Sequence, residues 1–256
     1  MRGELVLSIS TLLGFLLTLI RVSGVFIFVP LPGITSMINP ARVILSLGIT
    51  IALFPVWPEI PVVPSAGVFL LWVLTEAALG VGVGLTVAFV SESLAVGSQV
   101  IGLQAGYGFA ATIDPNTQAD SSVLVIYSQL AAGLLFFATG IDRDVLRVFA
   151  RSLEVWPPGT FVLSRGAAEQ VLFLGTGMLG TGLRLAFPII AILVMVDISL
   201  ALLGRVNSQL HLLTIAFPVK MLIGLAMLGW LALLLPTLYR AEMNSSFSVM
   251  RGLIAR

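Results

Sequence analysis

The sequence contains no cysteine among its 256 residues and a single histidine, His211. The missing cysteine excludes disulfides, thiolate metal sites and a cysteine nucleophile. One histidine excludes the H-E-x-x-H zinc site, which needs two. The sequence also lacks a GxxxxGK[ST] phosphate loop and a G-x-S-x-G nucleophile motif. We therefore expect no enzymatic activity, no metal and no cofactor.

Charge is scarce as well. Charged residues make up 10% of the chain and hydrophobic residues 58%, whereas a soluble domain carries about 25% charged residues. The mean hydropathy is +1.11. The net charge of +1 provides no basic field for a nucleic acid. The composition therefore predicts a protein in contact with membrane lipid.

Six apolar segments predict an all-α membrane protein. They cover residues 5–29, 41–57, 66–98, 123–139, 171–203 and 212–239 approximately. A membrane-spanning helix needs roughly 20 mostly apolar residues, so we expect about six long helices arranged in hairpins. Prolines inside the last two segments predict kinks there. The first segment is expected to be a retained helix, because no A-x-A cleavage site follows it.

Basic residues are unevenly distributed among the loops that six crossings would create. The positive-inside rule places the side rich in arginine in the cytoplasm, which here predicts two cytoplasmic termini. The N-terminal side holds Arg2, Arg143, Arg147, Arg151, Arg165, Arg240, Arg251 and Arg256, and the other side holds Arg42 and Arg205.

Residues 140–170 form the one substantial polar region, which we treat as a connector. Arg143, Arg147 and Arg151 recur there every four residues, which is typical of an amphipathic helix. Such a helix suits a membrane surface or a partner groove, or equally an exposed connection between spans. Apolar side chains are expected on its other face: Val145, Leu146, Phe149 and Leu153.

Five charged residues lie inside otherwise apolar segments. A charge at the centre of a spanning helix costs about 2.5–3.5 kcal/mol on insertion scales. Each therefore needs an ionic partner, an aqueous lumen or a location outside the hydrocarbon. They either form a conduit or hold helices together as ion pairs, for example Asp197 with Arg184 or Lys220. The five are Arg21, Glu76, Arg184, Asp197 and Lys220.

Glycine spacing predicts close helix packing. Gly80 and Gly84 form one GxxxG motif, and Gly102 and Gly106 form another. Small residues at this spacing let two helix backbones approach closely.

A glycine-rich stretch, residues 99–122, separates the third and fourth apolar segments. Its glycines allow bending, its first half is apolar, and a proline after Asp114 disfavours helix there. A flexible apolar loop needs a surface to pack against, and the lumen of a pore would provide one. We interpret the stretch as a gate or plug loop, with a buried connector as the alternative. The candidate residues are Gly102, Gly106, Tyr107, Gly108, Phe109, Asp114 and Pro115.

Several runs together resemble the FliR family of type III secretion export gates. They are GLQAGYGFAATIDPN at residues 102–116, WPPG at 156–159, and two segments that contain AFP, at 185–210 and 216–225. The run RVSGVFIFVPLPG, which starts at Arg21, is similar to the family's first helix and its exit. The order and spacing of these runs extend the resemblance across most of the chain.

This resemblance implies a structural channel component of the flagellar export gate, through which unfolded proteins leave the cytoplasm. It implies a single export-gate domain over residues 1–256, located in the bacterial inner membrane at the flagellar basal body. FliP and FliQ would be the partner subunits, with FlhB and FlhA nearby. Family members also lie partly above the membrane plane, which conflicts with six crossings. The alternative function is a small-solute or ion transporter that uses Glu76, Asp197 and Lys220.

Overall fold

The computed structural model describes residues 8–34, 39–58, 60, 63–107, 122–157, 159–161, 165–206 and 212–254. The described residues confirm the predicted all-α fold. The helices are α1 (Ile9–Phe28), α2 (Pro40–Ala52), α3 (Ala66–Ala105), α5 (Ser122–Ala138), α6 (Ile141–Val155), α7 (Arg165–Val206), α8 (Leu212–Ala232) and α9 (Leu235–Ile254), with a 3₁₀ turn η1 (Phe54–Val56) after α2.

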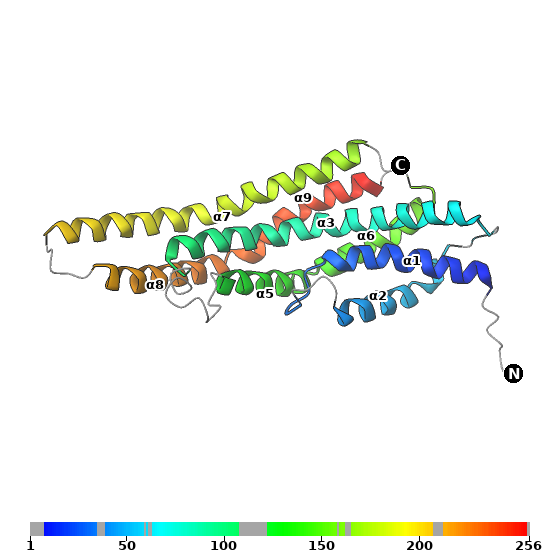
Figure 1. Cartoon of the computed structure of the whole chain (residues 1–256). Coiled ribbons are helices and arrows are strands. Elements are labelled where there is room, and N and C mark those ends of the chain that lie inside the picture. Colours follow the sequence, from blue (N-terminus) through cyan, green and yellow to red (C-terminus); the bar gives the residue numbers. More distant parts are fainter. Residues whose placement is uncertain are drawn as a thin grey trace.

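The helices lie roughly side by side along one long axis (Figure 1). Helix α3 is central and packs against α1, α5, α7, α8 and α9. Helices α3 and α7 have 40 and 42 residues, which corresponds to about 60 Å each at 1.5 Å per residue. A bilayer's hydrocarbon core is about 30 Å thick. An upright α3 or α7 therefore extends well beyond it.

The prediction of six crossings is wrong for the described residues. Four helices there are long and apolar enough to cross a membrane, namely α1, α3, α7 and α8, or five spans if α5 and α6, bent by 67°, count as one. Helix α2 has only 13 residues, about 20 Å, which is too short to cross. The predicted segment 212–239 is two elements, because α8 ends at Ala232 and α9 begins at Leu235.

Local sequence explains several helix ends. The Ser8 side chain accepts a hydrogen bond from the Thr11 amide at the start of α1, and Asn39 caps α2 in the same way. Serine and asparagine are favoured at this position because they satisfy an amide that has no partner within the helix. At the C-terminal end of α3, Gly106 adopts a left-handed conformation with φ of 87°, which glycine tolerates without strain.

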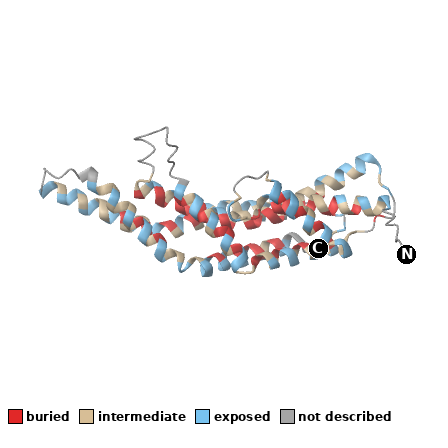
Figure 2. Cartoon of the chain, turned by 90° about the horizontal axis from the view of Figure 1, so that it is seen from below, coloured by how far each residue is buried: buried red, intermediate tan, exposed pale blue. Residues whose placement is uncertain are grey.

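The larger hydrophobic core lies where α1, α3, α6 and α9 meet. Buried positions run along the middle of the molecule (Figure 2). Tyr239 of α9 is buried there, and its hydroxyl lies 3.0 Å from the Ser91 hydroxyl of α3. Burial raises the pKa of Tyr239 above its ordinary value, so its phenol stays neutral and available for this hydrogen bond.

Helix α6 occupies the first half of the predicted connector, and α7 begins at Arg165, before the connector's predicted end at residue 170. The three arginines of α6 are exposed, whereas Val145, Phe149 and Leu153 are buried in the core. Leu146, which we expected on the apolar face, is instead 37% exposed. The docked face of α6 is therefore narrower than its sequence pattern suggests.

Candidate functional site

Two of the intramembrane charges form a buried ion pair. The Arg21 guanidinium on α1 donates from Nε and Nη2 to the two carboxylate oxygens of Glu76 on α3, and the Nη2–Oε1 distance is 2.9 Å. The two side chains are 0% and 1% exposed. A two-point contact between guanidinium and carboxylate is the strongest type of side-chain ion pair. It fixes the position of α1 along α3.

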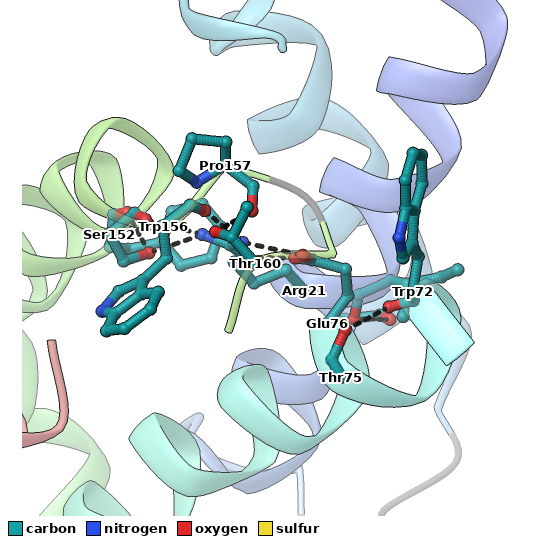
Figure 3. Close-up of polar contacts among 11 residues, drawn as sticks. Arg21, Trp72, Thr75, Glu76, Ser152, Trp156, Pro157 and Thr160 are labelled. Atoms are coloured by element: carbon teal, nitrogen blue, oxygen red, sulfur yellow. Dashed lines mark hydrogen bonds and ion pairs between the residues drawn. The ribbon is translucent and has the colours of Figure 1, made fainter. Parts of the chain in front are cut away.

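Arg21 also contacts the C-terminal end of α6 (Figure 3). Its Nη1 donates to the Ser152 carbonyl at 2.8 Å, and its Nη2 donates to the Trp156 carbonyl at 2.9 Å. Carbonyls at a helix C-terminus carry partial negative charge, and the Ser152 carbonyl accepts the arginine in addition to the Trp156 amide, which donates to it at 3.0 Å. The guanidinium therefore neutralises Glu76 and caps α6 at the same time, and so holds three helices together.

The segment after α6 packs tightly beside this network. The rings of Trp156 and Phe161 meet edge to face at 5.6 Å, and the Thr160 hydroxyl donates to the Pro157 carbonyl at 2.7 Å. Gly159 has φ of 78°, and a Cβ there would overlap the Trp72 ring of α3. Only glycine fits this position.

The glycine motif of α3 lies against α1 beside the Arg21 network. A Cβ at Gly80 would overlap the carbonyl oxygen of Arg21, and a Cβ at Gly84 would lie 2.8 Å from the carbonyl oxygen of Val25. Gly24 of α1 in turn faces the backbone of Gly80. The two helices thus touch backbone to backbone, as small-residue motifs permit.

A second polar cluster joins α3, α7 and α8 at the other end of α3. The Lys220 ammonium lies 2.9 Å from Asp197 Oδ1, and the Gln104 amide donates to Asp197 Oδ2 at 3.1 Å. Lys220 is 12% exposed and Asp197 42% exposed. The sequence left Arg184 and Lys220 open as partners for Asp197, and the structure pairs it with Lys220. Arg184 is exposed on α7 and belongs to none of the ion pairs among the described residues.

Asp197→Lys is expected to disrupt this cluster and, with it, assembly into the multi-subunit complex that the FliR resemblance implies. The substitution places two ammonium groups together and removes the acceptor of Gln104, and like charges in a partly buried site repel strongly. We expect a several-fold lower yield of assembled complex, measured by co-purification. Glu242→Lys on the exposed face of α9 is the control. Equal yields for the two variants would contradict a structural role for the cluster.

The same end of α3 bears the start of the predicted gate loop. The helix continues through Gly102, which is buried, to Ala105, so the loop begins later than the predicted residue 99. A Cβ on Gly106 would lie 2.6 Å from the Phe217 ring of α8. The Tyr107 hydroxyl donates to the Met221 carbonyl of α8 at 3.3 Å. The candidates Gly108, Phe109, Asp114 and Pro115 lie outside the described residues.

Sequence reasoning missed two charged residues. Glu92 lies inside the same apolar segment as Glu76, so the same signal, a charge within an apolar run, would have identified it. Arg42 was assigned to an outer loop, but it is 8% exposed. Its guanidinium donates to the carbonyls of Phe26 and Val29 at the end of α1. No local pattern distinguishes such an arginine from a loop arginine.

An all-α fold with several apolar spans, joined by backbone contacts and buried ion pairs, defines the class of helical membrane proteins. The particular family follows from comparison with known proteins. Residues 12–246 match the family described as "Bacterial export proteins, family 1". The match covers most of the chain, so this chain belongs to that family.

Curated relatives agree with this assignment. The chain is 27% identical over 219 residues to the "Flagellar biosynthetic protein FliR" of Escherichia coli strain K12, covering 84% of each chain. It is 22% identical over 245 residues to the FliR of Bacillus subtilis strain 168, covering 94% of this chain and 95% of the relative. It is 24% identical over 218 residues to the FliR of Aquifex aeolicus strain VF5, covering 85% and 84%. The predicted membership of the FliR family is confirmed.

Proposed function

We propose that this chain is a structural, non-enzymatic component of the flagellar type III protein export gate. Its location would be the inner membrane at the flagellar basal body. The observation that carries the proposal is the family match through residues 12–246, together with relatives that bear the name FliR over most of their length. The substrates would be unfolded proteins that leave the cytoplasm.

We propose FliP and FliQ as partner subunits, with FlhB and FlhA nearby. Large apolar side chains are exposed along α7 and α8, and both α3 and α7 are far longer than the hydrocarbon is thick. The part of these helices beyond the membrane needs a protein cover, because a large exposed apolar surface marks an interaction site. Prominent exposed side chains are Phe173, Phe187, Met195, Leu222 and Trp230.

We propose that the stretch matching the family's plug, Gly106–Asp114, contributes to closing the gate. The proposal is supported by the resemblance to the family and by the contacts of Gly106 and Tyr107 with α8. The tight contact of Gly106 with Phe217 gives the stretch a fixed starting point. The Gln104–Asp197–Lys220 cluster holds the same end of α3 against α7 and α8.

Deleting Gly106–Ile113 is expected to make assembled complexes leaky to ions. An apolar plug keeps water and ions out of the lumen. Without it, water can fill the lumen and ions can cross. The measurement is ion flux through vesicles that contain the purified complex, compared with wild type. Thr117→Ala in the same loop is the control. Unchanged ion tightness in correctly assembled complexes would contradict a plug.

The geometry argues against the transporter alternative. Glu76 is bound to Arg21, whereas Asp197 and Lys220 lie beside Gln104. Glu76 and Gln104 are 28 positions apart on the same helix, which is about 42 Å along its axis. Charges this far apart do not form a local relay. Ion transport by the purified chain alone in liposomes would overturn the export-gate proposal.

A further inference from the structure

A carboxylate that has no ionic partner among the described residues lies about two thirds of the way along α3. Glu92 is exposed, although it lies 13 residues before the end of an apolar 40-residue helix. The four ion pairs found among the described residues involve other side chains. The other acidic residues of α3 and α7, namely Glu76, Glu169 and Asp197, each contact a cation. Glu92 is therefore the exception among them.

Glu92 borders a partly open cavity of about 490 Å³, which we call the Glu92 cavity and which is lined mainly by α1, the segment after it, α3 and α5. Most of its lining is apolar, and Met178 of α7 contributes to it. Of its other polar side chains, Ser91 is bonded to Tyr239 and Arg42 donates to carbonyls of α1. Glu92 and the Gln129 side chain of α5 thus remain to receive a polar group.

The rim of the Glu92 cavity is apolar and exposed. Ile27 of α1 is 38% exposed, and Ile126 and Leu130 of α5 are 48% and 39% exposed. These side chains line the cavity together with Glu92. A carboxylate in such surroundings is costly against lipid but favourable against a matching cation in a dry interface. The volume is sufficient for one or two long side chains.

We propose that the Glu92 cavity is a docking site for a neighbouring subunit of different sequence, whose apolar helix inserts an arginine or lysine side chain to pair with Glu92. The inference rests on the proposed function, because it requires a hetero-oligomeric gate. A long aliphatic stem with a cationic end matches both properties of the cavity, its apolar wall and its carboxylate. The neighbouring apolar side chains would cover the rim of the Glu92 cavity and exclude water from the pair.

Glu92→Arg tests the proposal by charge repulsion at the interface. We expect the yield of assembled complex to fall about tenfold or more, because a like charge replaces the attractive pair, and to fall less for Glu92→Gln. Glu242→Arg on α9, also exposed, is the matched control and should assemble like wild type. The melting temperature of each isolated variant separates loss of docking from loss of folding. Assembly of Glu92→Arg at the wild-type level would overturn the proposal.

A second experiment identifies the occupant and does not depend on the folding of a charge variant. The chain has no cysteine, so Gln129→Cys carries the only thiol to which a photoreactive cross-linker can be attached. After illumination of the assembled complex, mass spectrometry should find a peptide of another subunit, with an arginine or lysine near the attachment point. Cross-links to a second copy of this chain, to lipid only, or to no partner would each overturn the proposal. If the wild-type chain forms no complex, the export-gate proposal fails as well. If the wild-type chain assembles, normal assembly of Glu92→Arg or a contrary cross-linking result overturns the docking site alone.

Discussion

Arg21→Met is expected to lower the free energy of unfolding by about 3–5 kcal/mol, the usual cost of breaking a buried ion pair by removing one partner. The substitution leaves the Glu76 carboxylate buried without a cation. It also removes the donors that cap the end of α6 at Ser152 and Trp156. Proteins are commonly stable by only 5–15 kcal/mol. We therefore expect a large drop in melting temperature in detergent, monitored by size-exclusion chromatography after heating.

Two further variants make this prediction specific. Arg147→Met removes an arginine whose side chain is 77% exposed and paired only with Asp144 on the same helix, and exposed pairs contribute at most about 1 kcal/mol. The double variant Arg21→Met, Glu76→Met removes the buried charge altogether and should recover part of the loss. An Arg21→Met melting temperature equal to that of Arg147→Met would refute the assigned role of the network.

Gly80→Val is also expected to destabilise the protein strongly, in this case through packing. Its Cβ would overlap the carbonyl oxygen of Arg21, which is backbone and does not rotate away. Overpacking a core costs about 1–3 kcal/mol, and we expect the upper end because α1 must move as a whole. Any such movement also pulls Arg21 away from Glu76. The measurements are the melting temperature of the isolated chain and the yield of folded protein.

Gly67 supplies the matched control in the same helix. A Cβ at Gly67 meets no heavy atom within 4 Å, and valine is at least as good a helix former as glycine, so Gly67→Val should leave stability nearly unchanged. Gly84→Val, whose Cβ would lie 2.8 Å from the Val25 carbonyl oxygen, should behave like Gly80→Val. Equal stability of the Gly67 and Gly80 variants would show that the spacing of the glycines is incidental.

The loop boundary shows why local composition is an incomplete guide. Glycine density made residues 99–105 look like loop, yet they continue α3 as a helix. Nearby, a Cβ on Gly97 would lie 2.9 Å from the carbonyl oxygen of Gly182 in α7. Ile101 and Ala105 belong to the buried cluster shared with α7 and α8. Tertiary packing of this kind outweighs the cost of glycine in a helix, which is about 1 kcal/mol per residue.

The sequence by itself determined the class of protein and the places where helices pack closely. Too few charges exist to coat a soluble globule, and the apolar runs predict helices because a backbone in lipid must satisfy its own hydrogen bonds. The order of its motifs also led to the FliR family. The charges inside apolar segments indicated that each needs an ionic partner or a polar environment, but not which residue that partner is.

Only the tertiary structure decided which charges meet. Arg21 and Glu76 are 55 positions apart, and Arg21 and Ser152 are 131 apart. Such pairs depend on which faces of the helices come together, and no local pattern encodes that choice. The same holds for Asp197, which contacts Lys220, and for Glu92, which contacts no cation among the described residues. The position of a residue on a helix sets the direction in which its side chain points, and the packing of the neighbouring helices determines which groups it contacts.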